Sequence, residues 1–248
     1  MTNIGVFDSG LGGLSVLKKL KEVHKANYFY LGDNLRVPYG DRDSSQILEF
    51  SYEIVSFLEK KDIDFYIIAC NTMSVVSKKM LEEKFNKKFI SITDMGIKQA
   101  LACREDIGLL ATKATCDSHF YKKEIEKYTS AKVHEISCQK LVKAIEEGKN
   151  TKEIDELLSY YLEEVIDKKI KNIILGCTHF PIVKENIQRL IPYEVNIFDP
   201  TDFLNDNINF KENDFTNIEI YMTKADDFSQ KMVNFVMEEG IKIKKAKI

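Results

Sequence analysis

The stretch Phe65–Thr72, FYIIACNT, indicates the fold class of this chain. A short apolar run ends in a cysteine and two small polar residues, and residues 74–85 then follow the pattern of a helix. Buried runs that alternate with helical segments are typical of parallel strands in α/β proteins. The stretch Asn172–His179, NIILGCTH, repeats the arrangement about 105 residues later. The sequence therefore predicts two similar α/β units.

The rest of the chain shows the same alternation of short apolar runs and amphipathic segments. Predicted strands cover residues 4–7, 27–31, 64–69, 88–92, 107–111, 132–136, 172–175 and 194–198. Predicted helices cover residues 12–24, 44–60, 74–85, 118–128, 139–148, 152–169 and 182–191. The strands predicted at 4–7 and 27–31 have counterparts at 107–111 and 132–136 with nearly the same offset, which favours an internal duplication.

The end of the chain predicts that the first domain is discontinuous. Residues 201–217 are polar and irregular, and residues 218–240 are expected to return to the first half. We predict an N-terminal domain of residues 1–97 plus 206–248 and a second domain of residues 98–205. The basic run at 241–248 is expected to be a solvated helix turn or a strand edge.

Composition excludes several classes of function. Apolar residues make up 44% of the chain, charged residues 30%, and the net charge is −3, so no basic field favours nucleic acid or an anionic membrane. No apolar stretch approaches the ~18 residues of a membrane span, and the N-terminal residues lack a signal-peptide pattern. The five cysteines, an odd number, favour reduced thiols in a cytoplasmic protein over a disulfide framework.

Two of these cysteines, Cys70 and Cys177, stand where chemistry is expected. Each is predicted between a strand end and a helix N-terminus, with N-cap residue types at Asn71 and Thr72 and a plausible first helical residue at Pro181. The partial positive charge of a helix N-terminus favours thiolate, and its free N–H groups can bind a carboxylate. The remaining cysteines lack this setting and are expected to be structural: Cys103, Cys116 and Cys138.

Other cysteine chemistries fit the spacing less well. A phosphatase loop needs an arginine six positions after the cysteine, where Val76 and Val183 stand. A Cys-x-x-Cys pair is absent, and the four histidines are scattered, which argues against a redox pair and against a metal site. A cysteine hydrolase that uses Cys177 and His179 stays open, although residues two apart around a turn rarely form the nucleophile–base hydrogen bond by themselves.

The glycine-rich turn Asp8–Gly13, DSGLGG, follows the first predicted strand and opens a helix. Ser15 occupies the position of the third glycine in a dinucleotide-binding loop, so that spacing fails. Asp8 and Ser9 are expected at a strand's carboxyl end, where a polar substrate could bind, although a turn or cap role for Asp8 stays open. Tyr39, in a Pro-Tyr-Gly turn, is a plausible wall of that site.

Six segments together resemble the glutamate racemase family, part of the aspartate/glutamate racemases. They are residues 5–15, 32–40, 69–72, 110–115, 141–148 and 175–181. The family implies two similar α/β domains with mostly parallel sheets flanked by helices, related by a pseudo-twofold axis, with the active site in the cleft between them. Lys143 departs from the proline expected at its position, and residues 198–201 also differ from the usual pattern.

The resemblance also implies residue roles and a reaction without pyridoxal phosphate, other cofactors or metal. Cys70 would take the Cα proton from D-glutamate and Cys177 from L-glutamate, while Asp8, His179 and Glu146 would assist. Residues implied at the substrate site are Asp8, Ser9, Tyr39, Gly40, Asn71, Thr72, Thr112, Thr115, Thr178 and His179.

The family further implies a cytoplasmic homodimer that supplies D-glutamate for peptidoglycan, and hence for cell-wall biogenesis and cell shape. Glutamate is the expected small-molecule partner, with no nucleic acid or membrane partner. Three alternatives stay open: a racemase or isomerase of aspartate or another acid, a carboxylate-binding protein on a decayed racemase scaffold, and a cysteine hydrolase.

Overall fold

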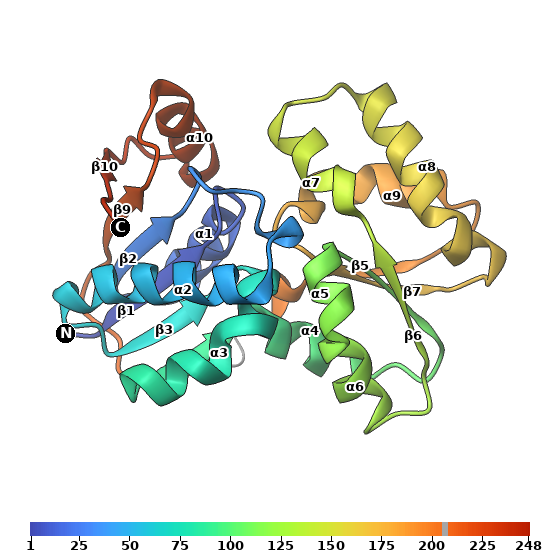
Figure 1. The fold of residues 1–248 in the computed structure, drawn as a ribbon, viewed down its shortest axis with the longest axis horizontal. Coiled ribbons are helices and arrows are strands. Elements are labelled where there is room, and N and C mark those ends of the chain that lie inside the picture. The colour runs from blue at the N-terminus through green and yellow to red at the C-terminus, as the bar shows by residue number, and fades with distance from the viewer. Residues whose placement is uncertain (205–207) are drawn as a thin grey trace.

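The computed structural model describes residues 1–204 and 208–248, which form two parallel β-sheets with helices on both faces (Figure 1). The first sheet contains β1 (Asn3–Asp8), β2 (Asn27–Gly32), β3 (Phe65–Ile68), β4 (Lys88–Ser91), β9 (Asn217–Met222) and β10 (Ile243–Lys245), in the order β10-β9-β2-β1-β3-β4. The second contains β5 (Ile107–Ala111), β6 (Val133–Ser137), β7 (Asn172–Gly176) and β8 (Asn196–Phe198), in the order β6-β5-β7-β8. Every strand pair within these sheets is parallel.

The strand order confirms the predicted pair of similar units. In the first sheet the central strands run β2-β1-β3-β4, and the second sheet has the same order when β5 is matched with β1. All eight strands predicted from the sequence are present, and none of their ends is shifted by more than two residues. The predicted fold class, two α/β units with parallel sheets flanked by helices, is therefore correct.

Helices cover both faces of each sheet because the strands are apolar on both sides. On the first sheet, α1 (Leu14–Val23) and α10 (Asp227–Met237) pack on one face, and α2 (Ser44–Leu58) and α3 (Asn71–Phe85) on the other. On the second, α5 (Lys113–Ser118) and α6 (Phe120–Glu126) cover one face, and α7 (Gln139–Glu146), α8 (Thr151–Asp167) and α9 (Lys184–Leu190) the other. Short 3₁₀ helices are η1 (Tyr39–Asp41), η2 (Glu59–Lys61), η3 (Phe180–Val183) and η4 (Pro200–Phe203).

The side chains of β1 point alternately to the two faces of the sheet and so contribute to two hydrophobic cores. Ile4 and Val6 belong to the cluster under α1 and α10, whereas Phe7 belongs to the cluster under α2 and α3. All three side chains are fully buried. Successive side chains point to opposite faces of a sheet, so a strand buried on both faces reads as a continuous apolar run.

The helix α4 (Ile92–Ala100), which the sequence did not predict, lies between the two units. It packs against α3 and β4 of the first unit and against α6, β7 and η4 of the second. A Cβ atom on Gly96 of this helix would lie 3.0 Å from the ring of Tyr121, so the glycine permits the close approach of α6. A glycine in the middle of a short helical pattern weakens that pattern, which explains why the helix was missed.

Three other local predictions differ from the structure at helix ends. The helix predicted at 118–128 is present as α6 from Phe120 to Glu126, and its start is shifted because His119, in the left-handed region at φ 52°, separates α6 from α5. The helix predicted from residue 74 begins at Asn71, and Cys70 itself is the N-cap residue, rather than Asn71 or Thr72. After Cys177, the 3₁₀ helix η3 begins at Phe180 and precedes α9, so Pro181 is the second residue of a 3₁₀ helix and not the first residue of an α-helix.

The end of the chain returns to the first sheet, as expected. β9 pairs with β2, and β10 of the basic run forms the edge strand beside β9. The predicted division of the domains at residue 97 falls within α4 and stays a prediction, and the predicted boundary between residues 205 and 206 lies outside the described residues. In the part of the chain that the structure describes, no helix has the length and apolar character needed to cross a membrane.

Candidate active site

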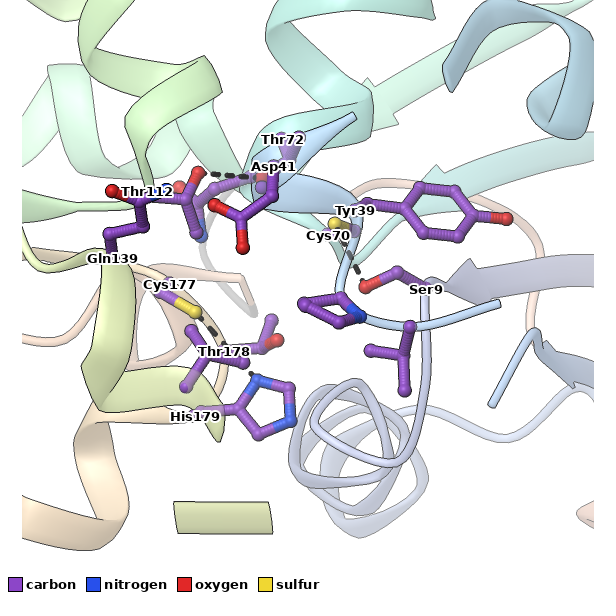
Figure 2. Close-up of a pocket in the computed structure, with 15 residues that line it drawn as sticks. Ser9, Tyr39, Asp41, Cys70, Thr72, Thr112, Gln139, Cys177, Thr178 and His179 are labelled. Atoms are coloured by element: carbon purple, nitrogen blue, oxygen red, sulfur yellow. Dashed lines mark hydrogen bonds between the residues drawn. The ribbon is translucent and has the colours of Figure 1, made fainter. Parts of the chain in front are cut away.

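The carboxyl ends of four strands meet at one pocket between the two units (Figure 2). Ser9 follows β1, Cys70 follows β3, Thr112 follows β5 and Cys177 follows β7. Predicted residues that line the pocket are Ser9, Tyr39, Gly40, Cys70, Asn71, Thr72, Thr112, Cys177, Thr178 and His179. Ligands of open α/β sheets bind at this position, beyond the carboxyl ends of the strands.

The Cys70 thiol is buried and hydrogen-bonded at the start of α3. Its Sγ donates to Ser9 Oγ over 3.5 Å, and the backbone N–H of Met73 also contacts the sulfur. Burial, followed by the negative charge of Asp8, raises the pKa of Cys70 to about 12. The expectation that the helix N-terminus favours thiolate at Cys70 was therefore wrong, because desolvation and a neighbouring carboxylate outweigh the helix N–H groups.

The Cys177 thiol has a histidine as its partner. Its Sγ lies 3.7 Å from His179 Nδ1, and His179 Nε2 lies 3.0 Å from Glu146 Oε1. Burial lowers the pKa of His179, but the hydrogen bonds to Cys177 and Glu146 outweigh burial and raise that pKa well above its usual value. A protonated imidazole beside Sγ stabilises a negative charge on the sulfur. Glu146 lies outside the pocket lining and contacts it through His179.

Asp8 joins the two units instead of contacting the Cys70 thiol directly. Its carboxylate accepts from the backbone N–H of Gly10 over 2.8 Å and from Thr178 Oγ1 over 3.3 Å. Burial raises its pKa. The glycines of the turn allow this packing, since a Cβ on Gly13 would lie 2.5 Å from Asp8 Cβ and one on Gly12 would lie 2.5 Å from Thr178 Oγ1.

Three threonine hydroxyls form a cluster across the boundary between the units. Thr72 Oγ1 and Thr112 Oγ1 are 2.8 Å apart, and Thr112 Oγ1 and Thr115 Oγ1 are 3.0 Å apart. Thr115 lies behind the pocket lining, in contact with Thr112. The loop that contains Gly40 packs closely against Thr112, since a Cβ atom on Gly40 would lie 2.7 Å from Thr112 Cβ. Hydroxyls can both donate and accept, which suits them to bind a carboxylate.

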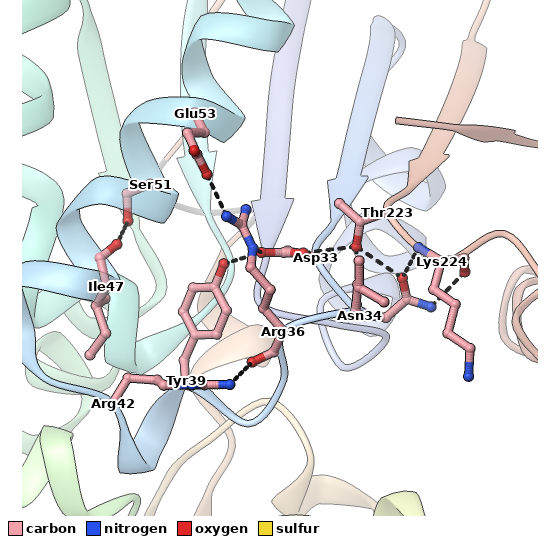
Figure 3. A network of polar contacts seen from close by, with 11 residues as sticks. Asp33, Asn34, Arg36, Tyr39, Arg42, Ile47, Ser51, Glu53, Thr223 and Lys224 are labelled. Atoms are coloured by element: carbon pink, nitrogen blue, oxygen red, sulfur yellow. Dashed lines mark hydrogen bonds and ion pairs between the residues drawn. The ribbon is translucent and has the colours of Figure 1, made fainter. Parts of the chain in front are cut away.

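Tyr39 is one of the residues that line the pocket, but its side chain extends away from the pocket (Figure 2), and its hydroxyl belongs to a separate network (Figure 3). The hydroxyl donates to the carboxylate of Asp33, which is fully buried and also accepts from Arg36 Nε and Thr223 Oγ1. Thr223 follows β9, so the C-terminal segment holds the loop that carries Tyr39. The ring packs beside Phe50 in the core of the first unit, so a role of Tyr39 as a wall of the substrate site stays a prediction.

Sequence reasoning missed five residues that line the pocket: Val37, Pro38, Asp41, Gln139 and Val142. Three of them lie within two residues of Tyr39 in the sequence, and this closeness was the only indication that they could line the same pocket. Gln139 follows Cys138, and Cys138 is the N-cap residue of α7 at the end of β6, so the statement that it lacks a strand-end setting was wrong. Its thiol nevertheless is fully buried and donates to Ile136 O over 3.5 Å, away from the pocket lining.

The sequence pattern of the family described as Asp/Glu/Hydantoin racemase matches residues 4–205. That match spans most of the chain, which therefore belongs to this family of isomerases. Along almost its whole length the chain is similar to proteins named glutamate racemase. It is 40% identical to glutamate racemase 3 of Caldanaerobacter subterraneus subsp. tengcongensis, over 81% of this chain and 75% of the relative. It is 33% identical to the glutamate racemase of Aquifex pyrophilus, over 98% of this chain and 97% of the relative.

A solved structure supports the same assignment. The glutamate racemase of Francisella tularensis subsp. tularensis SCHU S4, determined in complex with D-glutamate, superimposes with a TM-score of 0.88 at 29% identity. The match covers 99% of this chain and 97% of that protein. The family resemblance predicted from the sequence is thus confirmed.

Proposed function

We propose that this chain interconverts L- and D-glutamate without a cofactor, by moving the Cα proton between Cys70 and Cys177. The observation that carries the proposal is the meeting of two buried thiols from separate units at one pocket. They are near enough that charge on Cys177 contributes to the raised pKa of Cys70. Relatives named glutamate racemase, similar over nearly the full chain, support glutamate as the substrate.

In the direction from L- to D-glutamate, Cys177 acts as the base. Its thiolate, stabilised by protonated His179, forms an S–H bond with the Cα proton, and the electron pair of the C–H bond passes into the α-carboxylate. The S–H bond of Cys70 then breaks, and its proton adds to the opposite face of Cα. Cys70, whose raised pKa keeps it protonated, suits the role of donor. In the reverse direction the two thiols exchange roles.

A Cα proton beside an ammonium group is a weak acid, so the pocket must stabilise the carbanion. Preorganised donors in a site that excludes water provide this stabilisation. The donors that line the pocket include the first backbone N–H groups of α3 and the hydroxyls of Thr72 and Thr112. Asp8 assists by favouring the protonated state of Cys70, because its negative charge opposes thiolate there.

The family also supports proposals about the setting of the enzyme. We propose that D-glutamate made by this chain feeds peptidoglycan synthesis and so cell-wall biogenesis and cell shape. The enzyme would work in the cytoplasm as a homodimer, with glutamate as its small-molecule partner. We also retain the division into residues 1–97 plus 206–248 and residues 98–205 as the proposed domain structure.

The test follows the Cα proton and the chirality of the substrate separately. Reduced protein is incubated with L-glutamate in D₂O, loss of the Cα–H signal is followed by NMR, and the enantiomers are separated by chiral chromatography. We expect deuterated D-glutamate, with L-aspartate in a parallel sample reacting much more slowly. Cys138→Ala is the matched control, since Cys138 also follows a strand end but does not line the pocket. Absence of both exchange and racemisation in folded, reduced protein would contradict the proposal.

A further inference from the structure

A buried hydrogen bond between the two units lies directly behind the pocket. The hydroxyl of Tyr121, on α6, donates to Oδ1 of Asn71 over 2.6 Å. Asn71 is the first residue of α3, next to Cys70, and it lines the pocket, whereas Tyr121 does not. Both residues are almost completely excluded from solvent, with exposed fractions of 0% and 2%. The tyrosine of the second unit thus contacts a pocket residue of the first from behind.

This contact holds the Asn71 carboxamide in one orientation. An asparagine side chain has an oxygen that only accepts and a nitrogen that only donates, and a half turn exchanges them. In the structure the Tyr121 hydroxyl donates to Oδ1, so Oδ1 faces Tyr121 and Nδ2 faces away from it. A tyrosine hydroxyl can also accept, but in the reversed orientation Oδ1 would face the pocket and lose its donor.

The Nδ2 group is therefore available to the pocket. Among the residues that the structure describes, none forms a hydrogen bond with Asn71 Nδ2. A substrate carboxylate in the pocket would provide this N–H group with a charged acceptor. With the carboxamide reversed, a substrate carboxylate would meet an oxygen and be repelled.

The packing around Tyr121 holds its ring in one place. Its ring contacts α4 where Gly96 has no side chain, and a Cβ there would lie 3.0 Å from both Cε1 and the hydroxyl oxygen. The ring belongs to the core beneath α5 and α6, together with Ile125. The packed ring therefore fixes the position of the Tyr121 hydroxyl. If the Asn71 carboxamide rotated, the hydroxyl could not move with it.

We propose that Tyr121 is a positioning residue that holds the Asn71 carboxamide with its N–H groups toward a carboxylate of the substrate. This inference rests on the proposed racemisation of glutamate. It means that the second unit orients a substrate contact that the first unit carries, so that this contact is complete only when α3 and α6 are packed together.

The test removes one oxygen atom with Tyr121→Phe, which keeps the ring in the core. We expect KM for both L- and D-glutamate to rise about tenfold, with a smaller change in kcat, because the carboxamide is free to turn and the bond to a charged carboxylate is weakened. Tyr28→Phe is the matched control. Tyr28 is also fully buried, but its hydroxyl donates to Leu20 O and His24 O, remote from the pocket, so KM should stay at the wild-type value.

A second comparison separates positioning from a general loss of packing. Asn71→Ala combined with Tyr121→Phe should have the KM of Asn71→Ala alone, because the hydroxyl acts through the carboxamide. An unchanged KM in Tyr121→Phe, or independent effects of the two substitutions, would overturn the inference. Binding of L-glutamate measured by calorimetry tests the same point without catalysis. If wild-type protein binds glutamate but does not racemise it, the proposed function fails, while a tenfold weaker binding in Tyr121→Phe still supports the inference.

Discussion

Cys70 and Cys177 end equivalent strands of the two sheets, yet their surroundings differ in kind. Cys70 caps a long helix and contacts a serine hydroxyl, with the carboxylate of Asp8 nearby. Cys177 precedes a 3₁₀ helix, and its thiol contacts His179, which also contacts Glu146. The repeated topology places the sulfur atoms, whereas the neighbouring side chains give each sulfur a different electrostatic environment.

This difference suits a two-base reaction, which needs one thiol and one thiolate when L-glutamate arrives. Measurements of kcat/KM cannot show the asymmetry, however. The equilibrium constant between two enantiomers is one, so kcat/KM is the same in both directions at every pH. Each thiol must therefore be observed alone, through the exchange of the Cα proton on its own face of the substrate.

The largest effect is expected when either thiol is replaced by serine. Cys70→Ser and Cys177→Ser should each reduce racemisation by about a thousandfold or more, within the range for loss of an acid–base group. Cys70→Ser should still exchange the Cα proton of L-glutamate in D₂O, because Cys177 can remove and return a proton on the same face. Cys177→Ser should exchange only D-glutamate, and more slowly.

Proton NMR measures the exchange, and chiral chromatography measures the racemisation. Near-normal racemisation in either variant would contradict the two-base assignment. Exchange of D-glutamate by Cys70→Ser would show instead that the two faces have been assigned to the wrong thiols.

The next effect is a dependence on pH that is expected from the raised pKa of Cys70. The raised pKa of Cys70, about 12, means that its thiolate fraction grows about tenfold for each unit of pH below that value. In Cys177→Ser, exchange of D-glutamate should therefore rise about a hundredfold between pH 7 and pH 9. The pH profile of L-glutamate exchange in Cys70→Ser is the comparison, because the neighbour of Cys177 is the imidazole of His179 rather than a carboxylate. Parallel profiles would remove the proposed difference between the two thiols.

Much of the fold could be predicted because its signals are local. The strands in the middle of each sheet are buried on both faces, and such runs as residues 65–68 and 172–176 stand out against the polar chain around them. The strand β9 and the helix α10 were harder to predict from the sequence, because β9 begins with half-exposed residues and lies toward the sheet edge. Their partners lie almost 200 residues away in sequence, and no local pattern encodes such a pairing.

The site was predictable to the extent that it depends on strand ends. Ser9, Cys70, Thr112 and Cys177 follow strands, so their convergence follows from the topology. The contacts of Asp8 with Thr178 and of Tyr121 with Asn71 depend instead on how the two units pack against each other. The protonation of Cys70 was predicted wrongly because its raised pKa results mainly from burial. Burial depends on the complete folded structure and cannot be read from neighbouring residues in the sequence.

A smaller effect is expected from the partner of Cys177. His179→Gln keeps a side chain of similar size but removes the positive charge beside the sulfur. We expect kcat/KM to fall about a hundredfold, equally for L- and D-glutamate, since the thiolate loses its charged partner. Steady-state kinetics with each enantiomer measures this effect, and thermal unfolding of the same samples detects any loss of folding. A fall of less than tenfold would mean that His179 does not activate Cys177.

The smallest effect is expected from the partner of Cys70. Ser9→Ala removes the hydroxyl that accepts from the Cys70 thiol over 3.5 Å, a long bond that involves sulfur and lowers the pKa of Cys70 only in part. Its loss raises that pKa further and should reduce kcat/KM by about threefold, as expected for a weak hydrogen bond. Kinetics measured beside His179→Gln gives the comparison directly. A thiol that donates a proton depends less on a neighbouring group than a thiolate does. Equal losses of kcat/KM in Ser9→Ala and His179→Gln would show instead that the two thiols depend equally on their partners.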